Sequence, residues 1–284
     1  MDKQIANLCE FLDASCSVYH AHAQLVNMLN DAGYTRLCEA DSWNLAAGGK
    51  YYVSRGGTAL IAFRIPEAAP KGFLMSASHA DRPTFKVKEN GELQGKYTRL
   101  AVERYGGMLM GTWLDRPLSI AGRALVDTEN GVESRLVDID RDLLLIPNVA
   151  IHMNRKANEG YAWNPAVDTY PLIGGADSAG KLRKLIEKEA GGEIMGIDLR
   201  LYVRQTPAVW GLEEEYFSAA YGEDCPAGEI PIPGCEAAYI VELTSGTVVY
   251  SDNANEKMFP ASTTKLMTAL LAIEHIEAGS GSLE

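Results

Sequence analysis

Residues 73–90 read FLMSASHADRPTFKVKEN, and this stretch passes from an apolar run to a polar cluster, which is the most informative signal of the fold class. The apolar run Phe73–Ser78 predicts a strand, and the polar cluster His79-Ala80-Asp81 follows it directly. In open α/β sheets, ligands bind beyond the carboxyl ends of the strands. The stretch therefore indicates an α/β fold with a candidate site at a strand end.

Two interpretations of this cluster stay open from the residues alone. If strand geometry continues, His79 and Asp81 point to the same side. Asp81 then accepts the ring N–H of His79, which fixes the tautomer and leaves the other ring nitrogen for a metal. The alternative is a strand-end histidine capped by a turn aspartate, and the residues alone favour this simpler interpretation.

The flanking sequence alternates between helical and strand periodicity. Two amphipathic helices open the chain, the second ending near Gly33, and short strands separated by Gly-Gly follow. A strand-rich block comes next, then a helix stopped by Gly191-Gly192, then a cleanly alternating strand. This order predicts an α/β domain interrupted by a β-rich insertion. The segments are helices around Ile5–Leu12 and Leu25–Leu29, strands Tyr51–Val53 and Ala59–Ile65, the block Leu93–Ile151 with turns at Tyr105 and Glu129, helix Lys181–Lys188 and strand Asp198–Arg204.

A Gly/Pro-rich run, YGEDCPAGEIPIPG, covers residues 221–234 and predicts a linker. Beyond it, AYIVELTSGTVVYS predicts a hairpin folded at Ser245-Gly246. A helix is expected to begin near Ser262, so the fold closes with a short hairpin-helix tail.

The composition and charge of the chain limit which partners it is expected to bind and in which compartment it is expected to fold. The 284 residues carry a formal net charge of -12, which argues against nucleic acid or an anionic membrane as the main partner. Charged residues interrupt every apolar run, and the N-terminus has no basic region, so we expect neither a membrane span nor a signal peptide. The 5 cysteines are sparse and lack CxxC spacing, which favours a reducing cytoplasm.

Four ordered blocks resemble the aspartyl aminopeptidase family of zinc metallo-aminopeptidases over residues 1 to about 219. The first is the His-x-Asp run SASHADRPTFKVKEN, and the second is VERYGGMLMGTWLDRPLSIAGRA. The third and fourth are LVDIDRDLLLIPNVAIHMNR and DLRLYVRQTPAVWGLEEEYFSA. The resemblance implies a zinc-peptidase α/β/α domain that removes N-terminal, acidic residues from peptides at a paired zinc site.

The resemblance also implies roles for individual residues. His79 would be a zinc ligand, and Asp81 would orient it. His152 would be presented from the inserted domain toward a neighbouring subunit's active site, which implies a homo-oligomer. The alternative is a strand histidine whose hydrogen bonds are made within its own subunit. The segment SCSVYHAHA departs from the family's Pro-containing turn, which puts the local packing there in question.

The family's later metal-site motifs, beginning with an Arg-x-Asp segment, do not follow Phe217-Ser218-Ala219. A catalytic zinc needs about three protein ligands, and the sequence identifies one. The run Glu213–Glu215 falls at a pre-ligand turn and is expected to be a solvated loop. We therefore expect a truncated site with low activity.

The tail carries a separate signal, the Ser262-x-x-Lys265 spacing at a predicted helix start. One helical turn separates the two side chains, so they share a face, and a desolvated lysine can activate the serine. Residues 235 to about 275 resemble the start of the serine D-alanyl-D-alanine carboxypeptidases. That resemblance implies Ser262 as nucleophile and Lys265 as its base.

The sequence therefore predicts a cytoplasmic zinc aminopeptidase, incomplete here, acting on peptide substrates. The alternatives are a serine carboxypeptidase fragment and a non-catalytic assembly module. The expected organisation is a first part of the catalytic domain at 1–90, a β-rich assembly insertion at 91–200, a return strand at 201–220, a linker at 221–234 and the carboxypeptidase-like fragment at 235–284.

Overall fold

The computed structural model describes residues 3–68, 78–214, 216–219, 238–241 and 248–252. The chain divides into two compact units, one built from residues 1–70 and 77–227 and the other from residues 71–76 and 228–284. Within the described residues, no helix combines the length and the apolar character needed to cross a bilayer.

The first unit opens with the two expected helices, α1 (Lys3–Asp13) and α2 (Val18–Asp31). Ser17 caps α2, because its hydroxyl accepts a hydrogen bond from the backbone N–H of His20. Gly33 follows the helix in a left-handed conformation, as the sequence predicts.

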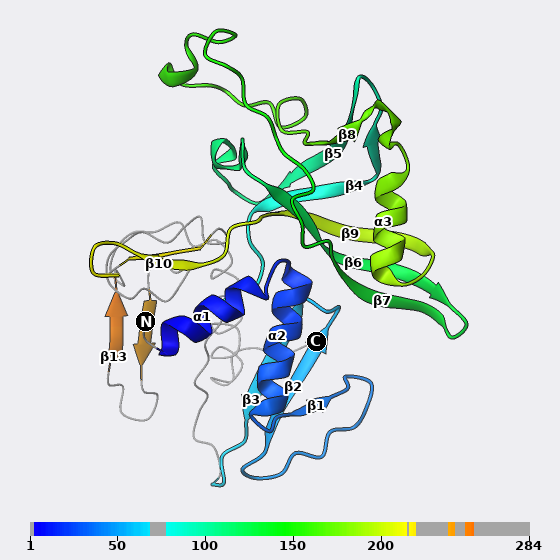
Figure 1. Ribbon diagram of the computed structural model, residues 1–284. Coiled ribbons are helices and arrows are strands. Elements are labelled where there is room, and N and C mark those ends of the chain that lie inside the picture. Colours follow the sequence, from blue (N-terminus) through cyan, green and yellow to red (C-terminus); the bar gives the residue numbers. More distant parts are fainter. Residues whose placement is uncertain (1–2, 69–77, 215, 220–237, 242–247, 253–284) are drawn as a thin grey trace, which may run out of the picture. The chain divides into compact units, whose positions relative to one another are not determined.

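A small sheet follows, in which β1 (Thr35–Leu37) pairs parallel to β2 (Lys50–Arg55), and β2 pairs antiparallel to β3 (Ala59–Arg64). This confirms the strands expected there. The buried Tyr52 of β2 donates a hydrogen bond from its hydroxyl to Asn30 of α2 at 3.0 Å, and this bond joins the helix to the sheet. Figure 1 shows α2 beside β2 and β3. The expected strand Phe73–Ser78 lies, apart from Ser78, outside the described residues.

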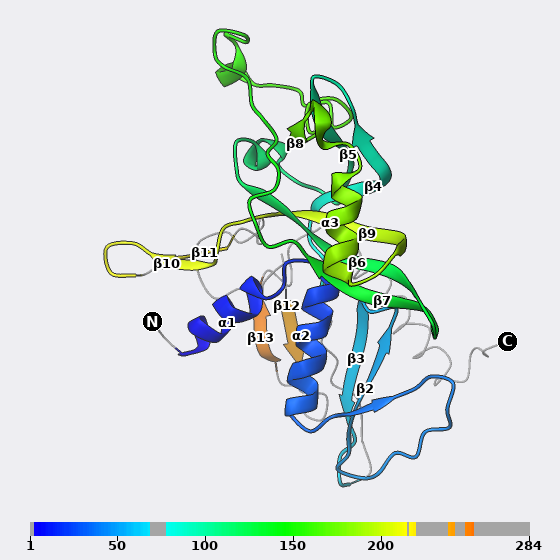
Figure 2. The same cartoon turned by 45° about the vertical axis from the view of Figure 1, so that its right-hand side comes forward.

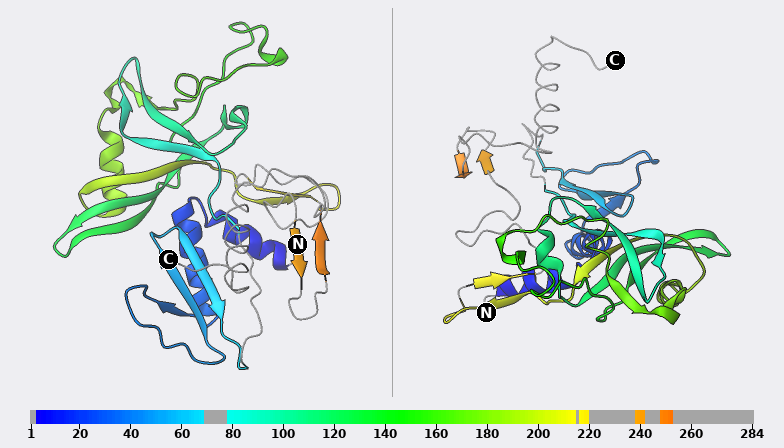
Figure 3. Two further views of the ribbon diagram at one scale, coloured as in Figure 1. Left: turned by 180° about the vertical axis from the view of Figure 1, so that it is seen from behind. Right: turned by 90° about the horizontal axis from the view of Figure 1, so that it is seen from above.

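The largest element is a six-stranded sheet with the order β7-β6-β9-β4-β5-β8, and all its pairs are antiparallel (Figures 1 and 3). The β6–β7 hairpin turns at Glu129-Asn130, as predicted, with Gly131 at a φ of 101°. The strand expected around Asp198–Arg204 is confirmed within β9. The bounds are β4 (Thr84–Leu93), β5 (Tyr97–Tyr105), β6 (Leu118–Thr128), β7 (Gly131–Asp138), β8 (Leu172–Gly175) and β9 (Ile194–Val203).

The helix α3 (Lys181–Ala190) lies on one face of this sheet (Figure 2). Its buried side chains Leu182 and Ile186 join the core formed with Leu118, Leu199 and Leu201. Gly191 ends the helix in a left-handed conformation, which confirms the predicted stop. Burial of these apolar side chains is the main stabilising contribution of this layer.

Side chains alternate between the two faces of β9, so that one face of the strand is apolar and the other is mainly polar. Leu199, Leu201 and Val203 enter the core that includes α3. Asp198, Arg200 and Tyr202 therefore point to the opposite face, where Tyr202 packs with Cys16 from the junction of α1 and α2. A polar face is thus built into the sheet beside the N-terminal helices.

The expectation of strands up to Ile151 is wrong beyond Asp138. Residues Leu144, Leu145 and Ile146 form only isolated bridges. Pro147 ends this pairing because it has no backbone N–H to donate. The short 3-10 helices are Met110–Trp113, Ala157–Glu159 and Ala176–Ser178.

Two hairpins complete the described strands. In the first unit, β10 (Ala208–Trp210) pairs with β11 (Tyr216–Ser218). In the second unit, β12 (Ala238–Val241) pairs antiparallel with β13 (Val248–Asp252), which confirms the expected hairpin pairing. Its predicted turn at Ser245-Gly246, the linker at 221–234 and the helix near Ser262 lie outside the described residues.

Candidate functional site

His79 and Asp81 lie in an irregular segment immediately before β4, and the structure brings their side chains together. The ring Nδ1 of His79 is 2.7 Å from the backbone oxygen of Asp81 and 3.3 Å from its Oδ1. Strand geometry, the condition under which both side chains would point to the same side, does not continue here, because residues 78–83 have no regular structure. The contact forms within this irregular segment, where Nδ1 of the ring approaches the backbone oxygen and the carboxylate of Asp81.

This contact assigns the two ring nitrogens different roles. Nδ1 faces two oxygens and therefore carries the proton in the neutral ring. Among the described residues no hydrogen bond engages Nε2. The His79 side chain is 67% exposed, so Nε2 has the lone pair and the access that a metal ligand requires.

Tyr105, at the end of β5, completes the environment of Asp81. Its hydroxyl donates a hydrogen bond to Asp81 Oδ2. This hydrogen bond, together with burial and the nearby carboxylate charge, raises the pKa of Tyr105. The hydroxyl therefore remains a donor at neutral pH.

The ring of Tyr105 contacts the polar face of β9, which carries Asp198 and Arg200. The Arg200 guanidinium lies 4.3 Å from the centre of the Tyr105 ring, and its Nη2 is 3.8 Å from Asp198 Oδ1. The other Asp198 oxygen accepts the hydroxyl of Tyr19 from α2 at 2.5 Å. Burial, and then the Asp198 hydrogen bond, raise the pKa of Tyr19 to about 12.

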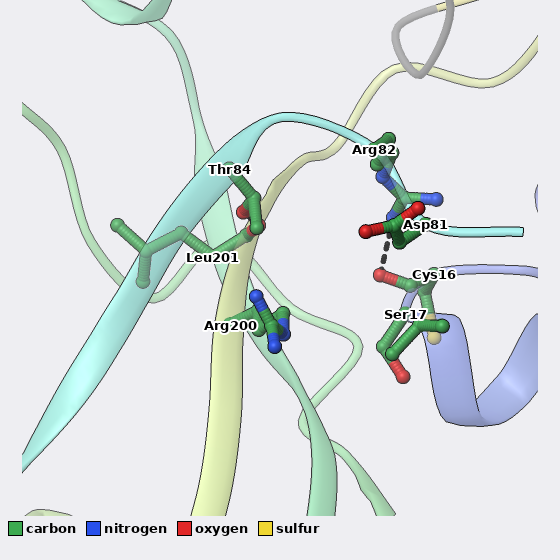
Figure 4. A pocket seen from close by; sticks show the side chains of 8 residues that line it. Cys16, Ser17, Asp81, Arg82, Thr84, Arg200 and Leu201 are labelled. Carbon is green, nitrogen blue, oxygen red and sulfur yellow. Dashed lines mark hydrogen bonds between the residues drawn. The ribbon is translucent and has the colours of Figure 1, made fainter. Parts of the chain in front are cut away.

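A cavity of about 10 Å³ lies where these elements meet (Figure 4). Asp81 and Arg200 line it together with Cys16, from the junction that precedes α2. Arg82 closes one side, because its guanidinium donates to the backbone oxygens of Ser15 and Cys16. A cavity of this volume holds about one water molecule, so it is not the substrate pocket.

The structure does not bring the other predicted site residues close to His79 and Asp81. His152 lies in an exposed turn between β7 and β8 and forms no hydrogen bond or ion pair with His79 or Asp81. Glu213 and Glu214 lie in the exposed loop of the β10–β11 hairpin, and Glu215 is outside the described residues. Ser262 and Lys265 also lie outside the described residues.

The donor set fits zinc only in part. His79, with Nδ1 held and Nε2 accessible, has the chemistry of a single zinc ligand. However, the described part of the chain contains no group of three or more His, Cys, Asp or Glu side chains able to hold a metal ion. One imidazole does not make a zinc site, so the described residues carry no metal-dependent step.

Tyr105 and Arg200 were missed as site residues by the sequence reasoning. The Tyr-Gly-Gly run was interpreted only as a turn and as part of a resembling block. Arg200 was visible as a polar position of an alternating strand, but its contact with Tyr105 depends on the pairing of strands far apart in the sequence.

Comparison with known proteins gives two family matches. Residues 11–225 match the family described as aminopeptidase I zinc metalloprotease (M18), and residues 231–283 match D-alanyl-D-alanine carboxypeptidase. A probable M18 family aminopeptidase 2 of Clostridium acetobutylicum is 37% identical over 264 residues, which cover 88% of this chain and 60% of the relative. Its counterpart in Pseudomonas entomophila is 39% identical over 227 residues, which cover 76% of this chain and 53% of the relative. The chain thus spans little more than half the length of these relatives.

Solved structures show the same fold. The Chaetomium thermophilum mApe1 structure matches with a TM-score of 0.69 and 29% identity, covering 75% of this chain and 53% of that one. The S. cerevisiae mApe1 dodecamer matches with a TM-score of 0.61 and 25% identity, covering 76% of this chain and 51% of that one.

Proposed function

The chain belongs to the aminopeptidase I zinc metalloprotease (M18) family, and from this premise we propose that it carries one zinc ligand and part of the framework of an enzyme that removes N-terminal residues from peptides. His79 is the proposed ligand, through Nε2, and Asp81 is the group that orients it. The observation that supports this proposal is the position of His79 Nδ1, which lies 2.7 Å from the backbone oxygen of Asp81 and 3.3 Å from its Oδ1.

The proposed chemistry is hydrolysis of the first peptide bond, with acidic N-terminal residues as the preferred substrates. Zinc held by His79 together with further ligands would supply Lewis-acid chemistry, which lowers the pKa of water to about 7 and polarises a carbonyl. The contribution of this chain is to hold the His79 ring in one tautomer and one orientation. His152 is proposed to act from the β-rich part of the chain toward the site of a neighbouring subunit.

The ligand count sets the expected strength of zinc binding. Catalytic zinc sites have about three protein ligands, and among the described residues His79 has no partner ligands. We propose that this chain binds zinc weakly and that it hydrolyses aspartyl or glutamyl p-nitroanilide negligibly.

Equilibrium dialysis with Zn²⁺ tests the ligand assignment. His79→Ala should remove the zinc bound by wild-type protein, whereas Cys38→Ser, at an exposed thiol, should leave it unchanged. Zinc binding that is identical in wild type and His79→Ala would contradict the assignment. Rapid zinc-dependent turnover that His79→Ala abolishes would show that further ligands exist.

We also propose that the chain is a cytoplasmic homo-oligomer that assembles through its β-rich residues 91–200. One matched structure is a dodecamer. Light scattering of the intact chain should give a mass of two or more times the 30.8 kDa of one chain. A monomer at all concentrations would contradict assembly and would also exclude a purely structural assembly module.

A second candidate function rests on the match of residues 231–283 to D-alanyl-D-alanine carboxypeptidase. Under this alternative, Ser262 is the nucleophile and Lys265 its base. The aminopeptidase proposal is favoured because its family match covers residues 11–225. A fluorescent β-lactam that labels wild-type protein but not Ser262→Ala would support the alternative, and absence of labelling would remove it.

A further inference from the structure

A second cavity, a groove of about 350 Å³, lies between α2 and the small sheet, apart from His79 and Asp81. Its walls come from α2, from Arg36 of β1, from Ser54 of β2 and from the β2–β3 turn. None of the lining residues is an aspartate or a glutamate. A groove of this volume accommodates a small organic molecule, whereas the cavity beside Asp81 holds about one water.

Strand pairing places Arg36 beside α2. Arg36 pairs with Tyr52 in the parallel β1–β2 ladder, so their two side chains point to the same face of the sheet. Tyr52 faces α2, because its hydroxyl donates a hydrogen bond to Asn30. Ser54 lies two residues after Tyr52 and therefore shares that face. Arg36 and Ser54 thus both project toward the helix.

His22 of α2 forms a fixed and neutral part of the groove. It is 8% exposed, and its Nε2 lies 2.9 Å from Ser54 Oγ. The ring also forms a hydrogen bond with the backbone of Ala59. Burial, and then the charge of Arg36, lower the pKa of His22, so the ring is uncharged at neutral pH. Among the lining side chains, Arg36 is therefore the one that carries a charge.

This charge is not neutralised within the described part of the chain. Arg36 is exposed, and no described hydrogen bond or ion pair engages its guanidinium. The nearby Arg55 differs, because Glu39 forms an ion pair with it. Asn27, on α2, is also exposed, and no described residue accepts a hydrogen bond from its side-chain amide. The groove thus offers one positive charge and several N–H donors.

The β2–β3 turn adds backbone groups to the groove. Thr58 N–H donates to the Arg55 oxygen at 3.3 Å, which makes Gly56 and Gly57 the two central residues of the turn. Their φ values of 63° and 72° are those of a type I′ turn. Arg123 Nη1 donates to the Gly56 oxygen at 3.1 Å. Because the peptide is trans, the Gly57 N–H points away from Arg123, and it has no acceptor among the described residues.

The charge and the walls of the groove indicate the class of ligand. One unpaired cation balances one negative charge, whereas a phosphate dianion would leave excess charge on a chain whose net charge is already -12. A carboxylate also matches the planar guanidinium, which can donate two parallel hydrogen bonds to it. Ala23 and Val26, one helical turn apart on α2, provide an apolar wall for a short carbon chain.

We propose that this groove binds the carboxylate of a small organic acid. Arg36 is the main contact of the carboxylate, and Asn27 and the Gly57 N–H are further donors. Ala23 and Val26 contact the carbon chain of the ligand. The site requires no metal and is independent of the role assigned to His79.

Saturation-transfer NMR of butyrate with the intact chain tests the proposal, because this method detects weak binding to proteins of any size. Butyrate should bind saturably to wild type. Arg36→Gln should weaken its binding by about tenfold or more, because the charged hydrogen-bond donor is lost. Arg64→Gln is the matched control: Arg64 is an exposed arginine of β3 that does not line the groove, so butyrate binding should be unchanged.

Three other compounds test the charge, the shape and the carbon chain of the ligand. Butyramide, which is uncharged, should bind about tenfold or more weakly than butyrate. Inorganic phosphate should displace butyrate only at much higher concentration. Acetate should bind several-fold more weakly, because it lacks the two CH₂ groups that would contact Ala23 and Val26.

Asn27→Asp is a second variant, which places a carboxylate at an exposed position of the groove and should also weaken butyrate binding. Thermal unfolding establishes that each variant is folded. No saturable binding to wild type would overturn the proposal, as would equal affinity in wild type and folded Arg36→Gln. If Arg36→Gln did not fold, unchanged affinity in Asn27→Asp would overturn it instead. Equally tight binding of phosphate or butyramide would overturn the assignment to a carboxylate.

Discussion

Gly106 shows how one residue determines the geometry of the candidate site. It combines a φ of 78° with a close approach to Pro83, whereas Gly107 has nothing within 4 Å of its Cβ position. Gly106→Ala should lower the free energy of unfolding by about 1–2 kcal/mol, because the left-handed conformation is unfavourable for alanine. Denaturant unfolding measures this difference. Gly107→Ala is the matched control, and equal losses in the two variants would contradict the role assigned to the Gly106 conformation.

Tyr19 provides a prediction of pH dependence. Its pKa is raised from 10.0 to about 12, first by burial and then by its hydrogen bond to Asp198. The unfolded hydroxyl ionises first, so this stabilisation is complete below pH 10 and is lost as the pH rises toward 12. At neutral pH Tyr19→Phe should be less stable by about 1 kcal/mol, from the lost hydrogen bond. The difference from wild type should shrink between pH 10 and 12 in urea unfolding, and a constant difference would argue against the raised pKa.

The helix α3 depends on a residue from a distant strand. Its N-cap is Gly180, which has no side chain to cap the helix. Glu92 of β4 takes this role, because its carboxylate accepts the backbone N–H groups of Gly180 at 2.5 Å and Leu182 at 3.2 Å. Negative charge at a helix N-terminus is favourable, since the unpaired N–H groups there carry partial positive charge.

Glu92→Ala should therefore lower the free energy of unfolding by about 1 kcal/mol. Glu89→Ala is the matched control, because Glu89 is an exposed residue of the same strand. Hydrogen exchange adds a local test, since the amides in the first turn of α3 should lose protection in Glu92→Ala only. Unchanged protection of these amides would contradict the capping role.

The same helix shows what could be predicted from the sequence. Its periodicity and its glycine stop are local signals, and both are confirmed. The Glu92 cap joins residues about ninety positions apart and has no local signal. The site divides in the same way. His79 and Asp81 are two residues apart, so their contact was foreseeable, whereas the contacts of Tyr105 with Asp81 and Arg200 depend on strand pairing.

Taken as a whole, the first unit combines a well-packed sheet with a locally apolar surface. The sheet core includes Phe85, Leu118 and Ile120, all 0% exposed. By contrast, the β10–β11 hairpin exposes Trp210 by 53% and Leu212 by 102%. Clustered exposed apolar side chains are a common feature of surfaces that bind other protein segments or promote aggregation.

This contrast predicts that dye binding and stability respond to different residues. Leu212→Ser should reduce the fluorescence of a bound hydrophobic dye and leave the free energy of unfolding within about 0.5 kcal/mol of wild type, because an exposed side chain loses little on substitution. Ile186→Ala, at a buried position of α3, should instead lower that free energy by about 2–5 kcal/mol. Dye fluorescence and denaturant unfolding of the same samples measure both effects. If Leu212→Ser destabilised the protein as much as Ile186→Ala, the hairpin would be part of the packed core and its apolar side chains would not be free to bind the dye.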